Sequence, residues 1–170
     1  MKKLAIALCL PLLCLAQSTP QARMERAVQR ELVMVPQYGV FDHLAYQVNG
    51  RTVTLTGSVT RPVTKLNAER NVKSIEAVEK VDNKITVLPI YAADDAIRLA
   101  VYRAIYGAPA LERYALQAVP SIHIIVNNGS VTLEGAVANK ADADMAVIRA
   151  KTVSGVFGVT SHLKLDTPTR

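Results

Sequence analysis

Histidine is the residue of this chain best suited to acid–base chemistry or to metal binding, and there are three: His43, His123 and His162. A zinc site or a nucleophilic triad requires several such side chains at a recognisable spacing. These three follow no short motif, and none coincides with another when the two halves of the sequence are superposed. We therefore expect isolated histidines, at strand ends or on exposed faces, with no metal and no cofactor.

Paired carboxylates are the second group that could do chemistry. Asp94 and Asp95 are adjacent, and Asp142 and Asp144 are two residues apart. Both pairs begin segments with helical periodicity, where negative charge is favourable and Asp94, Asp95 or the preceding Asn139 can cap the helix. The sequence contains no nucleophile elbow, zinc-protease, P-loop or dinucleotide-binding motif. These residues predict helix starts and a protein that is not an enzyme.

The N-terminal segment is typical of export. Lys2 and Lys3 precede an apolar run over residues 4–15, and small residues then allow cleavage after Ala16 or after Ser18. This run is shorter than the roughly 20 residues that a transmembrane helix requires. We expect a signal peptide over residues 1–18, a periplasmic mature protein and no integral membrane span.

Both cysteines of the chain, Cys9 and Cys14, lie inside this signal peptide. The mature chain would then form no disulfide and no thiolate metal site. An alternative is a lipoprotein anchored at Cys14, although Leu13 is larger than the residue that usually precedes such a cysteine.

The charge of the chain is mildly basic. The full sequence carries a net charge of +6, and removal of residues 1–18 takes away two lysines, leaving 18 − 14 = +4. This excess is too small and too dispersed to predict nucleic-acid binding. It is compatible with weak attraction to an anionic surface.

The sequence is internally repeated. Residues 53–59 read V-T-L-T-G-S-V and residues 131–137 read V-T-L-E-G-A-V, which is five identities in seven positions at an offset of 78. The same offset preserves the pattern of apolar residues without a gap from residue 48 to residue 87. We interpret this as a duplication, and internal repeats of this kind decide the fold.

Each copy has the periodicity of one small α+β module with the order αββαβ. Apolar residues four apart predict helices, and alternating apolar residues predict strands that meet at Asn-Gly turns. We expect two tandem modules, over residues 19–89 and 90–168, each with a three-stranded sheet packed against two helices. The predicted helices are 24–34, 62–76, 94–106 and 140–153, and the predicted strands are 44–48, 53–59, 79–88, 122–126, 131–137 and 157–165.

A helix, a hairpin ending in V-T-L-x-G-x-V, a second helix and a valine-rich closing strand together resemble the BON domain. Gly57 and Gly135 match the central glycine of that family, and the tandem copies resemble osmotically inducible envelope-stress proteins. The resemblance implies contact with phospholipid or with envelope proteins, and no catalysis. A periplasmic chaperone or protein-interaction scaffold is the alternative. Glycine weakens a strand, so we interpret Gly57 and Gly135 as packing positions and expect the second helix to cross the sheet there.

The helix predicted at residues 94–106 carries a second stripe besides the one expected to face the sheet. Tyrosine and arginine suit a wet interface with one apolar side. Three partners stay open for this stripe: the first copy, an anionic phospholipid surface, or another protein. The stripe that should face the sheet is Ile97, Val101 and Ile105, and the candidate contact residues are Arg98, Leu99, Tyr102, Arg103 and Tyr106.

Overall fold

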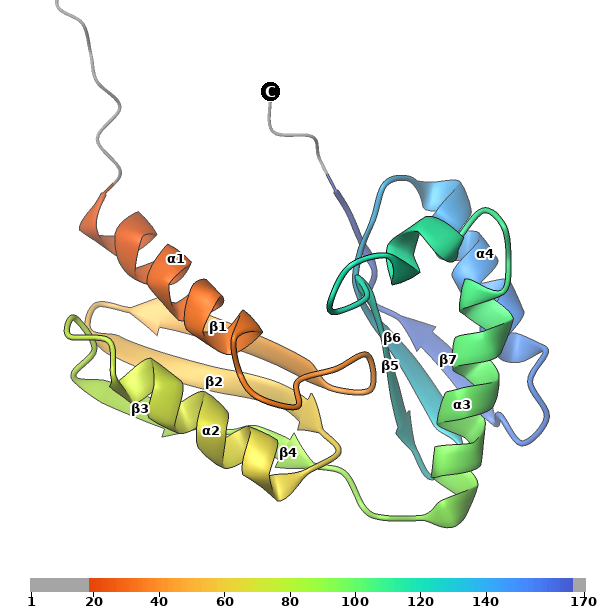
Figure 1. The fold of residues 1–170 in the computed structure, drawn as a ribbon, viewed down its shortest axis with the longest axis horizontal. Coiled ribbons are helices and arrows are strands. Elements are labelled where there is room, and N and C mark those ends of the chain that lie inside the picture. Colours follow the sequence, from red (N-terminus) through yellow and green to blue (C-terminus); the bar gives the residue numbers. More distant parts are fainter. Residues whose placement is uncertain (1–18, 167–170) are drawn as a thin grey trace, which may run out of the picture.

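The computed structural model of the protein describes residues 19–166. The expected signal peptide, including both cysteines, lies outside the described residues. The described chain forms two modules with the same order of α-helices and strands, confirming the α+β fold and the duplication, and module 2 has one additional 3-10 helix (Figure 1). Module 1 contains α1 (Pro20–Val33), β1 (His43–Asn49), β2 (Thr52–Val59), α2 (Pro62–Lys73), β3 (Lys80–Asn83) and β4 (Thr86–Val87). Module 2 contains α3 (Ala92–Tyr106), the 3-10 helix η1 (Glu112–Ala115), β5 (Ile122–Asn127), β6 (Ser130–Val137), α4 (Lys140–Lys151), β7 (Gly158–Ser161) and β8 (Lys164–Leu165).

The closing strand of each module is broken in two, whereas the sequence predicted one strand over 79–88 and one over 157–165. In module 1, β3 and β4 both pair in parallel with β2, which pairs antiparallel with β1. At the break, the Asn83 side-chain oxygen accepts a hydrogen bond from the Ile85 amide at 3.2 Å. This bond bends the chain and turns Ile85 into the core, where it is 1% exposed.

The helix starts were predicted partly correctly. Asn139 caps α4 as expected, accepting a hydrogen bond from the Asp142 amide at 2.9 Å. Helix α3 begins at Ala92, so neither Asp94 nor Asp95 caps it. Helix α1 begins at Pro20, four residues earlier than predicted, because Thr19 caps it and proline suits the first turn.

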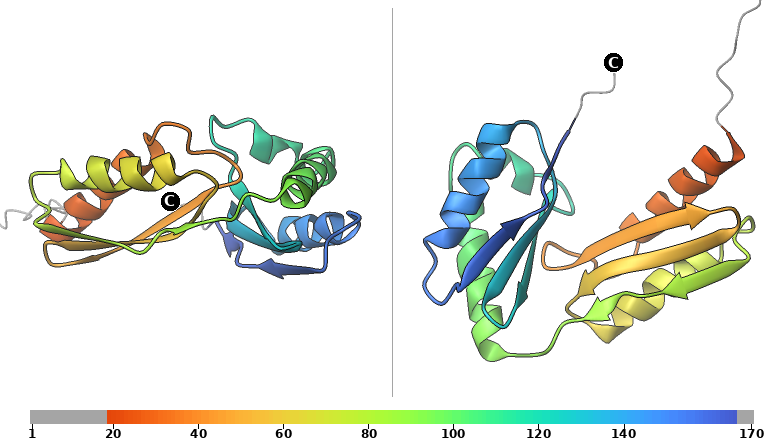
Figure 2. Two further views of the ribbon diagram at one scale, coloured as in Figure 1. Left: turned by 90° about the horizontal axis from the view of Figure 1, so that it is seen from below. Right: turned by 180° about the vertical axis from the view of Figure 1, so that it is seen from behind.

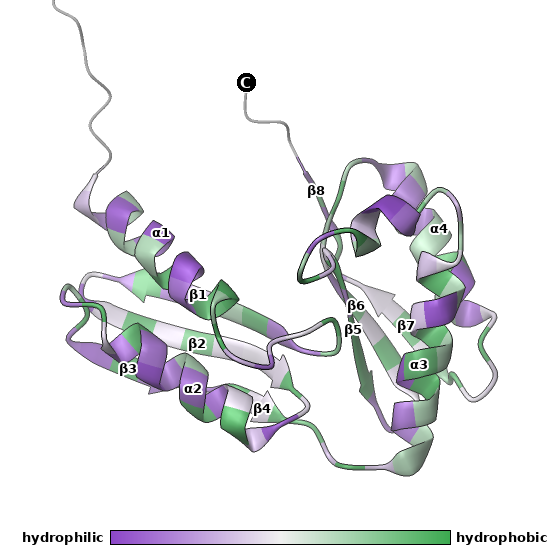
Figure 3. Cartoon of the chain, in the orientation of Figure 1, coloured by the Kyte–Doolittle hydropathy of each residue, from purple (hydrophilic) through white to green (hydrophobic). Residues whose placement is uncertain are grey.

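The core of each module consists of the residues that carry the repeat. Val53, Leu55 and Val59 on β2 are fully buried, and so are their equivalents Val131, Leu133 and Val137 on β6, at 1% exposure or less. In each module both helices pack on one face of the sheet, as Figure 2 shows from two further sides. Figure 3 shows that α1 and α2 turn a largely hydrophilic surface outward, whereas α3 alternates between hydrophilic and strongly hydrophobic residues.

Gly57 and Gly135 occupy the tightest backbone approaches in their sheets. Their φ angles are +110° and +113°. A Cβ atom at Gly57 would lie 2.1 Å from the carbonyl oxygen of His43, and one at Gly135 would lie 2.0 Å from that of Ser121. The glycines are therefore packing positions, but the element that crowds them is the start of the neighbouring strand and not the second helix of the module.

Candidate functional site

Helix α3 presents its expected stripe to the sheet of module 2. Ile97, Val101 and Ile105 are buried in the module 2 core, as their four-residue spacing predicted. The candidate contact residues lie on the remaining circumference of the helix, and the structure divides them into two groups.

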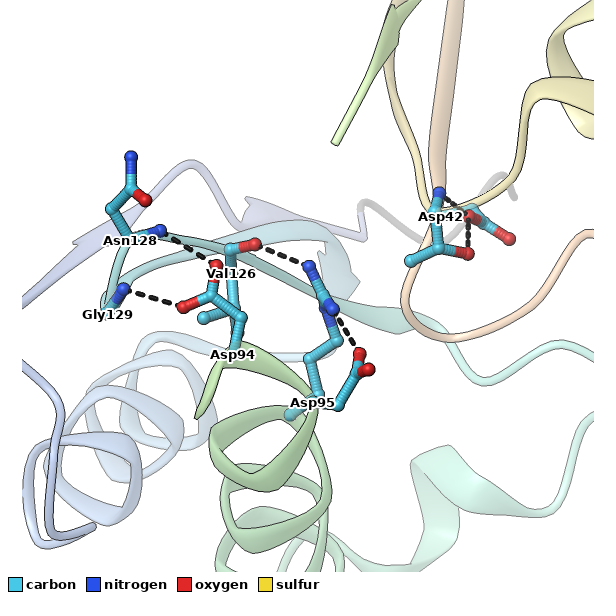
Figure 4. Close-up of polar contacts among 8 residues, drawn as sticks. Asp42, Asp94, Asp95, Val126, Asn128 and Gly129 are labelled. Atoms are coloured by element: carbon cyan, nitrogen blue, oxygen red, sulfur yellow. Dashed lines mark hydrogen bonds and ion pairs between the residues drawn. The ribbon is translucent and has the colours of Figure 1, made fainter. Parts of the chain in front are cut away.

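Arg98 belongs to the buried group. Its Nη2 donates a hydrogen bond to the Val126 carbonyl oxygen at 2.8 Å, and its Nη1 pairs with Asp95 (Figure 4). The side chain is only 5% exposed. Arg98 therefore links α3 to β5. The sequence had suggested a contact residue on an open face, and that prediction is wrong for Arg98.

Tyr106 is the second buried candidate. Its hydroxyl donates a hydrogen bond to the Ile122 carbonyl oxygen at 2.6 Å, at the start of β5. Burial raises the pKa of Tyr106 above its usual value, so the hydroxyl stays a donor. Helical spacing alone could not show this, because the partner carbonyl lies 16 residues further along the chain.

Leu99, Tyr102 and Arg103 form the accessible group, although Tyr102 is half-buried because it also contacts module 1. Its ring packs against Phe41 of module 1 in a T-shaped arrangement, with ring centroids 6.2 Å apart. Leu99 is 48% exposed and Arg103 is exposed. One part of the stripe therefore packs on module 1, and the other part faces solvent.

Two further apolar residues extend this accessible group. Ile90, just before α3, is 85% exposed, and Leu116, just after η1, is 81% exposed. Ile90 and Leu99 line a cavity of about 390 Å³, and Arg103 and Leu116 line a shallow hollow of about 480 Å³. We call Ile90, Leu99, Arg103 and Leu116 together the outer α3 face. The sequence had not pointed to Ile90 or Leu116, because neither belongs to the helix.

Asp94 and Asp142, one from each pair of carboxylates, form hydrogen bonds to other elements of module 2. The sequence predicted only their position at helix starts. Asp94 accepts hydrogen bonds from the amides of Asn128 and Gly129, both at 2.9 Å, and so holds the β5–β6 turn against α3 (Figure 4). Asp142 accepts a hydrogen bond from the Tyr114 hydroxyl and pairs with Arg113. The Tyr114 hydrogen bond is the main reason that the pKa of Asp142 is lowered.

The three histidines meet at the contact between the modules, contrary to the expectation of isolated side chains. His43 of β1 and His123 of β5 have ring centroids 5.9 Å apart. The Glu134 carboxylate lies 3.8 Å from His43 Nε2 and 2.7 Å from His162 Nδ1. His123 is buried, and its ring stacks on Tyr38 at 5.4 Å. Residues 19–166 contain no group of three or more His, Cys, Asp or Glu side chains placed to hold a metal ion.

We call this contact the module junction; it joins residues 38–43 of module 1 to β5 and Glu134 of module 2. Its backbone link is a hydrogen bond from the Ile124 amide to the Val40 carbonyl oxygen, 2.8 Å long. Residues 122–126 are all buried, whereas most of β1 is only half-buried. The sequence carried a signal for this difference in the second strand phase, which reads His123 and Ile125 in β5 but Ala45 and Gln47 in β1.

Burial at the junction favours the neutral form of His43 and His123. Burial lowers the pKa of His123, and the neighbouring His43 lowers it further, opposed in part by the Gly39 and Asp42 backbone and the Asp42 charge. Burial also lowers the pKa of His43, which the Glu134 carboxylate opposes. The His43 Nδ1 atom is buried without a hydrogen-bond partner among the described residues. The other charged or titratable groups near the two rings are Tyr38, His162 and Lys164.

Mild acid is therefore expected to weaken the protein. Histidines of the unfolded chain bind protons below about pH 6.5, whereas His43 and His123 of the folded chain resist until a lower pH. Their contribution to stability is complete above pH ~6.5 and is lost as the pH falls toward the folded pKa values. Urea unfolding followed by circular dichroism at about pH 7.5 and about pH 5 measures this loss.

The His123→Phe variant supplies the control, because phenylalanine keeps a ring against Tyr38 but does not titrate. Its stability is expected to fall less between the two pH values than that of the wild type. His162→Gln, at an exposed position, should behave like the wild type. If His123→Phe loses as much stability as the wild type, the buried histidines are not the cause.

No helix within residues 19–166 has the length and apolar character to cross a bilayer. The comparison with curated proteins found no match. Among solved structures, the chain is similar to CdsD, a structural protein of the type III secretion system of Chlamydia trachomatis, at 13% identity and a TM-score of 0.31, over 85% of this chain and 92% of that chain. The C-terminal domain of CdsD gives 15% identity and a TM-score of 0.27, over 81% and 96%. These TM-scores are too low to support any argument about this protein.

The family comparison agrees with the repeat. The BON domain matches twice in tandem, over residues 21–89 and 93–167. BON domains are generally non-catalytic binding domains, usually associated with the cell envelope, and the family is associated with phospholipid binding and envelope stress. This chain belongs to the BON domain family and carries two copies of the domain.

Proposed function

We propose that the mature protein is a non-catalytic periplasmic module pair that contacts anionic phospholipid of the cell envelope through the outer α3 face. Export would remove residues 1–18 and leave the two modules, within residues 19–89 and 90–168. The association of the BON family with phospholipid binding supports this assignment.

The outer α3 face is the observation that carries the proposal. It combines an exposed cation with three exposed apolar side chains, a composition that suits the boundary between lipid headgroups and acyl chains. Arg103 forms no ion pair with any of the described residues, so its charge is available to a lipid phosphate. The apolar residues are too few to anchor the protein. We therefore expect weak, reversible binding that falls with increasing salt.

Replacement of Arg103 by glutamate tests this site. A basic residue near an anionic leaflet contributes about 1 kcal/mol, and reversal adds repulsion of similar size. Binding to vesicles of phosphatidylglycerol and phosphatidylcholine should therefore weaken roughly tenfold or more at low salt. Co-sedimentation measures this binding, with pure phosphatidylcholine vesicles as the lipid control.

The Arg149→Glu variant is the matched control for Arg103→Glu. Arg103 and Arg149 are both exposed, unpaired among the described residues and in the last turn of a helix, so both variants have the same charge and the same helix-end effect. Equal weakening by the two variants would mean that net charge alone matters. If the wild type binds no anionic vesicles at low salt, the lipid proposal fails.

A periplasmic chaperone or scaffold is the second candidate function. The observation in its favour is the cavity of about 390 Å³ beside the linker, whose apolar lining includes Phe41, Pro89, Ile90 and Leu99. Such a lining could hold an apolar side chain of a partner protein. In that case, Ile90→Ser should suppress protection of an aggregating client protein, whereas Arg103→Glu, which lies outside this cavity, should leave that protection unchanged.

A further inference from the structure

The outer surface of the two helices of module 1 carries exposed charge of one sign. On α1 and α2, every exposed charged side chain is basic, and the three acidic residues, Glu25, Glu31 and Glu69, are half-buried. The exposed cations are Arg23, Arg26, Arg30, Arg70 and Lys73.

Most of these cations have no ion-pair partner among the described residues. Lys73 pairs with Glu69, whereas Arg23, Arg26, Arg30 and Arg70 form no ion pair with any residue of the described chain. The three arginines of α1 are spaced three and four residues apart, which places them on one side of the helix. Unpaired like charges repel one another at no benefit to folding, so this arrangement fits an anionic partner better than a purely structural role.

Exposed apolar side chains accompany the arginines and narrow the choice of partner. Val33 continues the arginine stripe three residues after Arg30, and Met34 follows it. Leu66 is exposed on α2, four residues before Arg70. A nucleic-acid backbone offers nothing to these apolar side chains, whereas a membrane interface accommodates both groups.

We propose that the outer surface of α1 and α2, with Arg23, Arg26, Arg30 and Arg70 as its cations, is a second contact for an anionic phospholipid leaflet. This inference rests on the proposed function and adds module 1 to it. Figure 2 shows α1, α2 and α3 on the same side of the module 1 sheet, and we expect both contacts to meet the same leaflet. Two weak contacts on one chain bind more tightly than either alone, because the second contact is intramolecular.

The test is a triple variant, Arg23→Gln with Arg26→Gln and Arg30→Gln. Glutamine has nearly the helix propensity of arginine, so α1 and the melting temperature should be unchanged. Each arginine near an anionic leaflet is worth about a fivefold factor in affinity, so binding to phosphatidylglycerol-containing vesicles should fall roughly a hundredfold at low salt.

The matched control removes the same charge elsewhere, as Lys80→Gln with Arg149→Gln and Lys151→Gln. These residues are exposed, unpaired among the described residues and outside α1, α2 and α3. We expect the control to bind within a few-fold of the wild type. Equal losses for the two triple variants would overturn the inference, because net charge would then explain both.

The outcomes separate this inference from the proposed function. If the wild type binds vesicles, Arg103→Glu weakens binding and the α1 variant binds like the wild type, only the inference fails. If the wild type binds no vesicles, the proposed function fails. If the α1 variant loses binding to a DNA duplex while vesicles are not bound at all, the stripe serves a nucleic acid, and the inference is wrong.

Discussion

Replacing Gly135 by alanine is expected to lower the stability of the protein by an unusually large amount for a substitution that adds one methyl group. The new Cβ would lie 2.0 Å from the Ser121 carbonyl oxygen, and the backbone would keep a φ of +113° that disfavours any side chain. Relief requires β5 and β6 to separate where the Ala136 amide donates to Ser121. We expect a cost on the order of 3–5 kcal/mol and a fall in melting temperature of roughly 15 °C or more, measurable by circular dichroism.

Two other glycines separate the causes of this loss. Gly50 has a positive φ of +59° with no atom within 4 Å of an added Cβ, so Gly50→Ala measures the conformational cost alone, about 1 kcal/mol. Gly158 is also open and has no positive φ, so Gly158→Ala should melt like the wild type. If Gly135→Ala melts like Gly50→Ala, the close approach to Ser121 does not limit stability.

Val72→Asp is expected to unfold module 1. Val72 is 0% exposed in the module 1 core, between α2 and the sheet. A buried carboxylate with no partner costs several kcal/mol, which is comparable to the whole stability of a module of this size. Two-dimensional NMR should show the amide signals of module 1 collapsing to unfolded positions.

The control lies on the same helix. Val63 of α2 is 42% exposed, so a carboxylate there stays hydrated, and Val63→Asp should melt within a few degrees of the wild type. A folded Val72→Asp variant would show that the protein tolerates a charge in its core. A collapse of the module 2 signals as well would show that the modules unfold together through their junction.

The fold could be predicted from the sequence because the information for each module is local. Val53, Leu55 and Val59 alternate along one strand, recur in the second copy and are buried in the structure. Asn49-Gly50 and Asn128-Gly129 mark the hairpin turns by residue type alone. The break in the closing strand could not be predicted, because it coincides with local side-chain hydrogen bonds, from the Ile85 amide to Asn83 and from the Leu163 amide to Ser161, that apolar alternation does not reveal.

The candidate site could be predicted only in part, because helical spacing shows which residues share a side but not what covers that side. Leu99 and Arg103 are accessible, whereas Arg98 and Tyr106 reach carbonyl groups of β5. The meeting of the histidines depends on how the two modules dock. The repeat alignment does not reveal that docking, since none of the three histidines aligns with a histidine in the other copy.

The hydrogen bond from Ile124 to Val40 has a consequence for how the duplicated modules depend on each other. Strand β5 pairs with β6 on one side, and on the other side residues 38–43 shield it from solvent. Excised alone, module 2 would present β5 as an open sheet edge, because the hydrogen bond from the Ile124 amide to Val40 and the contacts of His123 with Tyr38 and His43 would be lost. Such an edge recruits strands from other chains and promotes aggregation. Module 1 therefore protects the β5 edge of module 2, and separation of the two modules after a proteolytic cut in their linker is expected to promote aggregation.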